Sequence, residues 1–142
     1  MKQYKKKVSA VIITNKEKSR FYTQKKDDSY PIKKFSNHYC FFGGAAENNE
    51  SPEEALKREL EEELEKEASS LVYNSSRRIF EINNQKYNFH MDLFESILST
   101  EEITKISKMK VGEGSGVIVS KKELLEKKFV SELESYLKEY FN

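Results

Sequence analysis

Three glutamates, Glu59, Glu62 and Glu63, are spaced so that their carboxylates fall on one side of a helix. At about 100° per residue they span roughly a 100° arc, which borders a seam of leucines at every fourth position. Neighbouring carboxylates repel one another and raise one another's proton affinity. A hard cation between them removes that penalty, and oxygen ligands favour Mg²⁺ or Mn²⁺. The spacing therefore predicts a divalent-metal site at the border between core and solvent.

The same segment has a second interpretation, as an ordinary solvated helix surface. Eight glutamates and three basic residues lie between Glu53 and Glu67, and Glu-rich helices are commonly solvated faces with i,i+4 ion pairs. The glycine pair Gly43-Gly44, just before the helix, favours the metal interpretation. Glycines let the backbone approach a ligand closely, and their carbonyl oxygens can also bind a cation.

The segment from Gly44 to Glu63 resembles the Nudix box, whose pattern is G-x5-E-x7-R-E-U-x-E-E-x-G-U, with U an aliphatic residue. Glu50 and the run from Arg58 to Glu63 occupy the required positions, so seven of the nine specified positions agree without a gap. The last two differ, because Glu65 replaces the usual glycine and Lys66 the usual aliphatic residue. These positions normally end the helix, so the departure concerns the helix exit more than the metal site.

The resemblance implies a fold, an activity and a set of site residues. Nudix domains are α/β/α sandwiches with a mixed β-sheet, and Nudix hydrolases cleave a pyrophosphate bond in compounds in which a nucleoside diphosphate is linked to another group. Arg58 would orient the glutamates through charged hydrogen bonds, with Glu50 in a supporting role. The metal ligands that the resemblance implies are Glu59, Glu62, Glu63 and the carbonyl oxygen of Gly44.

A general base outside the box is often needed, and several carboxylates are available for that role. We predict Glu113, in the stretch V-G-E-G-S-G, because some relatives place a glutamate-glycine loop near the metals. Its alternative is an exposed turn residue. Weaker candidates are Glu81, Asp92 and Glu95, since strand carboxylates usually face solvent.

Two pairs of lysines and a group of aromatic residues are candidates for substrate binding. Lys25 and Lys26 would reach substrate phosphates from a loop at the cleft, as would the pair Lys33-Lys34, although ordinary surface charge is the alternative. His90 could contact a base or a phosphate of the substrate, but it is expected to be a sheet histidine with its hydrogen bonds satisfied. The aromatic candidates for nucleobase stacking, whose default role is core packing, are Tyr87, Phe89 and Phe94.

The rest of the chain predicts the elements that position these residues. The β-branched run 8–14 and the segment 21–24 predict a hairpin, and 39–42 predicts a short strand that leads into the glycines. Ser51, Pro52 and Glu54 are start signals for the glutamate-bearing helix. The later elements expected are strands within 71–98 around an Asn-Asn turn, a strand at 117–119, and helices that begin after Ser120 and Ser131.

The composition predicts one α/β domain over residues 1–142 with a mixed sheet. The chain is 37% hydrophobic and carries nine Phe and eight Tyr, enough bulky material for a core. A net charge of +1 and 21 lysines against four arginines argue against a protein built mainly to bind nucleic acid.

The single cysteine and the apolar runs bear on location. Cys40 is followed by two phenylalanines and is expected to be a buried thiol, and a chain without a disulfide favours a reducing compartment. No apolar run is long enough to cross a bilayer, and the basic start is expected to lead into a first strand rather than a signal peptide. We therefore expect a cytoplasmic protein.

The function predicted from these observations is hydrolysis of a pyrophosphate bond in a nucleoside di- or triphosphate derivative, by water attack at phosphorus, with Mg²⁺ or Mn²⁺ as cofactor. The expected partner is a small-molecule nucleotide, not a membrane, and nucleic acid is disfavoured. Two alternatives stay open: a nucleotide-binding or sensor domain without turnover, and an RNA 5′-end pyrophosphohydrolase, which would want a basic and aromatic groove.

Overall fold

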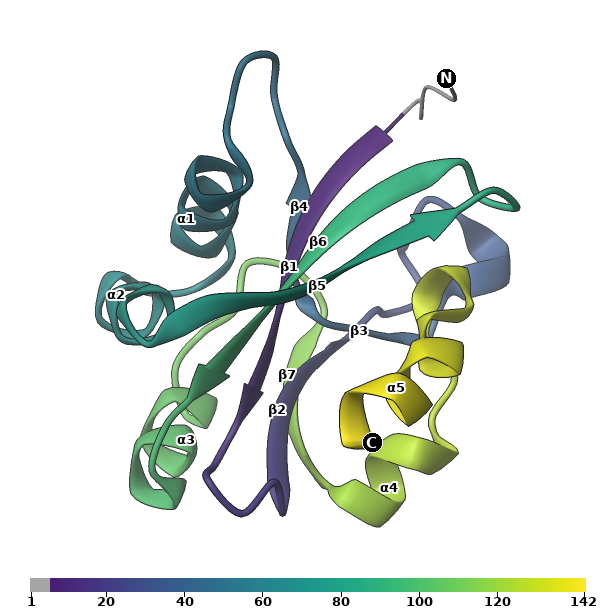
Figure 1. Ribbon diagram of the computed structural model, residues 1–142. Helices are drawn as coiled ribbons and strands as arrows, with labels where there is room; N and C mark the ends of the chain where they lie inside the picture. The colour runs from purple at the N-terminus through teal and green to yellow at the C-terminus, as the bar shows by residue number, and fades with distance from the viewer. Residues whose placement is uncertain (1–5) are drawn as a thin grey trace.

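The computed structural model describes residues 6–142, which form one mixed β-sheet with helices on both of its faces (Figure 1). The strands are β1 (Lys6–Thr14), β2 (Arg20–Lys25), β3 (Tyr39–Cys40), β4 (Phe42–Ala45), β5 (Ser76–Asn84), β6 (Phe89–Ile97) and β7 (Ser115–Ser120). The α-helices are α1 (Pro52–Glu63), α2 (Lys66–Asn74), α3 (Thr100–Ser107), α4 (Lys121–Glu126) and α5 (Leu137–Phe141), with short 3₁₀ helices η1 (Lys33–Phe35) and η2 (Val130–Tyr136).

The first strand organises the sheet. β1 runs parallel to β6 along nine residue pairs and antiparallel to β2 and β4. The main order is β3-β2-β1-β6-β5, while β4 adds to β1 and β7 adds to β2. The parallel β1–β6 pair among antiparallel neighbours makes the sheet mixed, and this confirms the α/β/α sandwich expected from the sequence.

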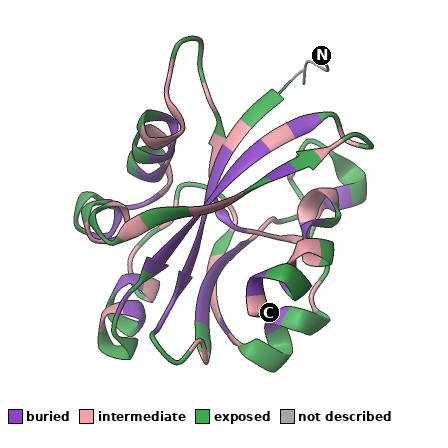
Figure 2. Ribbon diagram, in the orientation of Figure 1, coloured by how far each residue is buried: buried purple, intermediate pink, exposed green. Residues whose placement is uncertain are grey.

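The two faces of the sheet are covered by different helices. Successive side chains of a strand point to opposite faces, so Val11 and Ile13 of β1 pack with α1, α2 and α3, whereas Ala10 and Ile12 pack with α4, η2 and α5. Figure 2 shows the buried residues concentrated along the central strands and on the inner sides of the helices. None of the helices within residues 6–142 is long and apolar enough to span a bilayer.

Several predicted boundaries are confirmed and others are wrong. The box helix begins as predicted, because Ser51 caps it, Pro52 is its first residue and Glu54 completes the capping box. Residues 71–74 were expected in strand structure but belong to α2, whose Ala68 and Val72 pack into the core. The helix α3, between β6 and β7, was not predicted, although Ser99 and Glu102 form a capping box at its start.

The predicted start of the helix after Ser131 is also wrong. Ser131 and Glu132 have left-handed backbone conformations, with φ of 56° and 58°, and the α-helix proper begins only at Leu137. The reversal at this point lets both Phe129 and Leu133 enter the core. The spacing of apolar residues predicts the buried face of such a segment, but it does not reveal that two residues adopt a left-handed backbone conformation.

Candidate active site

The glutamate-bearing helix α1 is fixed by its buried leucine seam. Leu56 and Leu60 are fully buried and Leu64 is 6% exposed, so this face of α1 lies against the sheet. Glu59, beside the seam, is mostly shielded from solvent, with 16% of its side chain exposed, whereas Glu62 is 58% exposed. The carboxylates therefore lie at the border between core and solvent, as the spacing predicts.

Arg58 orients these carboxylates through several hydrogen bonds. Its guanidinium donates to both carboxylate oxygens of Glu50, at 2.8 and 3.0 Å, and to Glu59 and Glu62, each at 3.2 Å. A fifth hydrogen bond reaches the carbonyl oxygen of Ala45 at the end of β4. The planar guanidinium fork can satisfy several acceptors at once, so one side chain ties the loop before α1 to the acidic face.

The two glycines are required by close packing. A Cβ at Gly44 would lie 2.4 Å from the carboxyl carbon of Glu59, in space that the carboxylate occupies. Gly43 has a φ of +143°, and a Cβ there would lie 2.1 Å from the carbonyl oxygen of Ser9 on β1. The glycine pair therefore lets β4 pass between β1 and the acidic face of α1, which places the Gly44 backbone beside Glu59.

Glu63 lies in an environment that suits a cation. Burial raises the pKa of its carboxyl to about 8, and the nearby charge of Glu59 acts in the same direction. The Lys26 ammonium and a backbone hydrogen bond from Gly43 oppose this rise. Glu63 Oε2 is buried and has no hydrogen-bond partner among residues 6–142. An oxygen in this position fits a ligand to a divalent ion, as do the neighbouring carboxylates.

Burial also raises the pKa of Glu59, and the charge of Glu62 adds to this effect, while hydrogen bonds from Arg58 counteract it. The two shielded carboxylates of the box are thus both harder to ionise than free glutamates. A divalent ion would reverse this, because its charge favours the ionised form of each ligand.

The loop that follows α3 is fastened to the end of α1. The Gly112 N–H donates to the carbonyl oxygen of Glu63 at 2.7 Å, and Leu64 forms a β-bridge with Val111. The Lys110 N–H donates to the carboxylate of Glu65 at 2.8 Å. The atypical glutamate of the box therefore anchors this loop, and the chain leaves α1 through extended backbone at Leu64.

This loop brings Glu113 to the site. Its carboxylate lies 3.9 Å from the Lys26 ammonium, and its charge contributes to the raised pKa of Glu63. The side chain is 53% exposed, so it borders the acidic cluster at the solvent edge. The side-chain amide of Gln24 donates to the Glu113 carbonyl oxygen at 2.8 Å and so holds the loop against β2.

A cavity of about 420 Å³ opens beside the glycines. Lys26, Gly43 and Gly44 lie at its lining, together with two of the predicted aromatics, Tyr87 and Phe89. The other residues that line it are Lys6, Val8, Tyr30, Ile32, Lys34, Phe35, Cys40, Ala45, Met91, Val130, Ser131 and Leu133. The titratable charges on this lining are all lysines, which suits an anionic ligand with an aromatic group.

The predicted lysine pair and the predicted aromatic group are each divided between two places in the structure. Lys26 lines the cavity with an 11% exposed side chain, whereas the Lys25 ammonium lies over the ring of Tyr39, 6.0 Å from its centroid. Phe94, the third aromatic candidate, is buried against α1 and α2 on the other face of the sheet. Cys40, expected to be a buried thiol, is half-buried at the cavity, and desolvation raises the pKa of its thiol to about 11.

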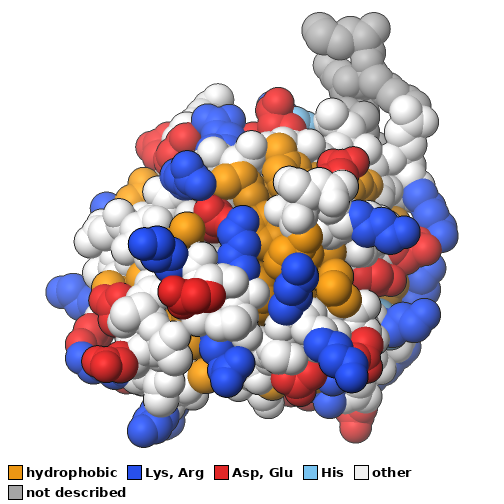
Figure 3. All heavy atoms as spheres, turned by 60° about the horizontal axis from the view of Figure 1, so that its bottom comes forward, with side chains coloured by type: hydrophobic (Ala, Val, Ile, Leu, Met, Phe, Trp, Pro, Cys, Tyr) orange, Lys and Arg blue, Asp and Glu red, His pale blue; other side chains and the backbone are white. Residues whose placement is uncertain are grey.

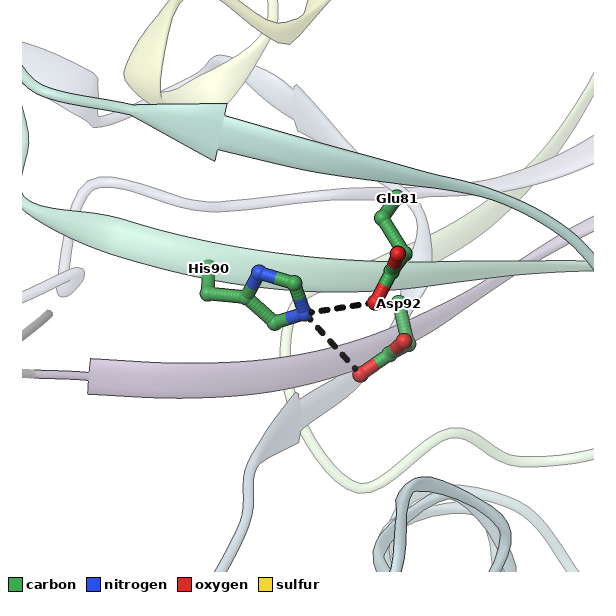
Figure 4. A group of neighbouring side chains, drawn as sticks. All are labelled: Glu81, His90 and Asp92. Carbon is green, nitrogen blue, oxygen red and sulfur yellow. Dashed lines mark ion pairs between the residues drawn. The ribbon is translucent and has the colours of Figure 1, made fainter. Parts of the chain in front are cut away.

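The three weaker base candidates lie in two other places. Glu95 is 2% exposed and accepts a hydrogen bond from the Tyr140 hydroxyl between β6 and α5. Glu81 and Asp92 converge on His90 across β5 and β6 (Figure 4). No sequence pattern indicates that these three residues meet, because their meeting depends on the register between the two strands.

A family model and several solved structures match this chain. A family model described as the NUDIX domain matches residues 3–140. A structure from work on MutT from Aliivibrio salmonicida and Vibrio cholerae is 21% identical, with a TM-score of 0.66 and coverage of 94% of each chain. A mutT/nudix family protein from Listeria innocua is 18% identical, with a TM-score of 0.69 and coverage of 99% of this chain and 94% of that one.

A MutT protein from Methanosarcina mazei Go1 is 14% identical, with a TM-score of 0.69 and coverage of 99% of this chain and 95% of that one. At these identities the likeness to the solved structures concerns the fold. Among curated proteins, no sequence matches this chain significantly.

Proposed function

This chain belongs to the NUDIX domain family, and we propose that it hydrolyses a pyrophosphate bond in a nucleoside di- or triphosphate derivative, by attack of water at phosphorus. The observation that carries the proposal is the convergence of the Gly44 backbone, the carboxylates bonded to Arg58, and a buried oxygen of Glu63 that has no hydrogen-bond partner among residues 6–142. A solvated helix surface would have no need to bury an acidic oxygen without a partner.

The residues present fit Mg²⁺ or Mn²⁺. Glu59, Glu62, Glu63 and the carbonyl oxygen of Gly44 would hold the ion, and all of these donors are hard oxygens. When bound, a divalent ion neutralises the charge of the diphosphate and favours deprotonation of water.

The other residues of the site have separate roles in this proposal. Arg58 fixes the orientation of Glu59 and Glu62 through charged hydrogen bonds. Lys26, with its ammonium near both Glu63 and Glu113, would contact a phosphate of the substrate. Glu113, at the solvent edge, would accept the proton of the attacking water.

The cavity would hold the nucleoside part. Tyr87 and Phe89 lie at the cavity lining, where a nucleobase would stack on the half-buried ring of Tyr87 beside the 5% exposed Phe89. Lys34 lies 5.1 Å from the ring centroid of Tyr87. The proposed location is the cytoplasm, which suits a half-buried single cysteine that stays reduced.

We expect the purified protein to release phosphate or pyrophosphate from at least one member of a nucleotide panel, only with Mg²⁺ or Mn²⁺ present. Glu62→Gln should lower kcat/KM by orders of magnitude, because it removes the charge of a metal ligand and weakens the charged hydrogen bond from Arg58 while the exposed position leaves the fold intact. Glu61→Gln, at the neighbouring exposed position, should leave turnover unchanged. Equal activity of the Glu62 variant and the wild type would refute the ligand assignment.

Two other results would select the alternatives. Nucleotide binding with no turnover in either metal would indicate a sensor domain. Turnover confined to 5′-triphosphorylated RNA would indicate an RNA-end hydrolase. On the face drawn in Figure 3, positive and negative side chains are interspersed around hydrophobic ones.

A further inference from the structure

We propose that Glu81, His90 and Asp92 form a second divalent-metal site, separate from the Nudix box and suited to a first-row transition ion such as Zn²⁺. The three side chains point toward one another from β5 and β6 (Figure 4). One ligand atom from each lies within 4.8 Å of the other two. A nitrogen donor distinguishes this group from the oxygen-only donors of the box, and imidazole suits zinc and its neighbours better than magnesium.

The register of two paired strands fixes the group. His90 and Asp92 are two residues apart on β6, so they project from the same face. Glu81 on β5 pairs directly with Asp92, and Asn83 pairs directly with His90. Side chains on paired strands are held more rigidly than side chains on a loop, which is what a metal site requires.

The distances match tetrahedral coordination. His90 Nε2 lies 3.3 Å from a carboxylate oxygen of Glu81 and 3.4 Å from one of Asp92. For metal–ligand bonds of about 2.0–2.1 Å, the edge of a regular tetrahedron is about 3.3–3.4 Å. The two nitrogen–oxygen distances therefore match the edges that one tetrahedral ion would impose, and the ligand atoms of Glu81 and Asp92 lie within 4.8 Å of each other.

Asn83 orients the imidazole as a ligand. His90 Nδ1 lies 2.7 Å from the side-chain oxygen of Asn83, which is an acceptor, so Nδ1–H donates to it. In the neutral ring this leaves the lone pair on Nε2, directed at the two carboxylates. A ring N–H held by an oxygen outside the metal site is the usual companion of a metal-binding histidine. Because Nε2 faces two carboxylate oxygens, either a metal ion or a proton must lie between Nε2 and these oxygens.

The surrounding charges leave room for a cation. Arg78 contacts Oδ1 of Asp92 at 3.1 Å but shares its charge with Glu53 at 3.0 Å. Oδ2 of Asp92 is the oxygen turned toward His90, and the side chain is 8% exposed. Lys7 and Arg78 line the adjoining cavity and oppose a cation there, whereas the carboxylates of Glu50, Glu81 and Asp92 on the same lining favour one.

A cavity of about 610 Å³ adjoins the group, lined by Glu81, His90 and Asp92 and by Glu50 and Pro52 at the start of α1. Three protein ligands with an open fourth position are typical of zinc sites that bind water or a small ligand. We therefore expect the fourth position to face this cavity.

The test is metal binding measured without activity. In a Cys40→Ser background, which removes the only thiol, with excess Mg²⁺ to occupy the oxygen sites, calorimetry should detect one Zn²⁺ per chain. Co²⁺ should give the intense visible absorption of tetrahedral coordination. His90→Ala should lower Zn²⁺ affinity at least about 100-fold, and Asn83→Ala by about 10- to 100-fold. His38→Ala, which changes the other histidine, should have no effect.

Adding Glu59→Gln, Glu62→Gln and Glu63→Gln should leave Zn²⁺ binding unchanged, which separates this site from the box whatever the fate of the proposed hydrolysis. If His90→Ala fails to fold, Glu81→Gln at the exposed ligand position should still weaken binding. In this triple-variant background, the proposal is overturned by a Zn²⁺ stoichiometry of zero, by binding that survives His90→Ala, or by a weak octahedral Co²⁺ spectrum.

Discussion

At the scale of single residues, the Nudix box contains two carboxyl groups, those of Glu59 and Glu63, whose pKa is raised by burial. Glu63 is the extreme case, since one of its oxygens has no partner within residues 6–142 and its carboxyl pKa is raised to about 8. Arg58 compensates Glu59 and Glu62 instead, through direct hydrogen bonds. The metal-free protein therefore carries an electrostatic cost at Glu63 that a divalent ion would relieve.

This cost predicts how the stability of the metal-free protein depends on pH. Because the folded-state pKa of Glu63 is above the unfolded value, the folded state binds the proton more tightly. The contribution of Glu63 to the free energy of unfolding is complete below about pH 4.5 and is lost as pH rises to about 8. Denaturant unfolding with a chelator should show wild type losing stability relative to Glu63→Gln across this range. A difference that does not change with pH would contradict the assignment.

At the scale of elements, the departure from the box pattern has a structural role. Glu65 has a φ of −62° and takes the place of the usual glycine without strain, as the residue preceding α2. Its carboxylate accepts the Lys110 N–H, beside the Leu64–Val111 bridge and the Gly112 hydrogen bond. These contacts hold the loop that carries Glu113 against the end of α1.

We predict that Glu65→Ala loosens this loop without unfolding the domain. The amide of Lys110 should exchange with solvent faster, and kcat should fall several-fold, because a positioned base is worth about 10²–10⁴ in rate and is here only displaced. Glu61→Ala, on the exposed side of α1, is the matched control and should change neither quantity. Unchanged exchange at Lys110 together with unchanged kcat would show that the loop is held by other contacts.

The sequence was informative about elements with local signals. The capping box at Ser51 and the leucine seam predicted α1, its buried face and the place of its glutamates, because both signals lie within one helix. Successive side chains of a strand point to opposite faces, but the sequence does not show which of Lys25 and Lys26 points toward the cleft. In the structure Lys26 lines the cavity and Lys25 does not. The left-handed pair at Ser131 carried no glycine to reveal it.

At the scale of the whole molecule, the site depends on contacts between segments far apart in the chain. β4 brings Gly44 to α1 by pairing with β1, and the loop before β7 brings Glu113. The Glu81, His90 and Asp92 group depends on the β5–β6 register, which no pattern within either strand reveals. The roles proposed for the box residues came from the resemblance to a family. The positions of Lys26 and of the Glu81, His90 and Asp92 group could be found only from the structure, because they depend on contacts between distant segments.

The most direct measurement is anomalous diffraction from crystals grown with Mn²⁺ and a non-hydrolysable nucleotide analogue. We predict manganese beside Glu59, Glu62 and Glu63, within bonding distance of a phosphate oxygen of the analogue, and the nucleoside in the cavity lined by Lys26, Tyr87 and Phe89. Manganese absent from these carboxylates, with the analogue bound elsewhere, would contradict the claim that this acidic face holds a metal against a diphosphate.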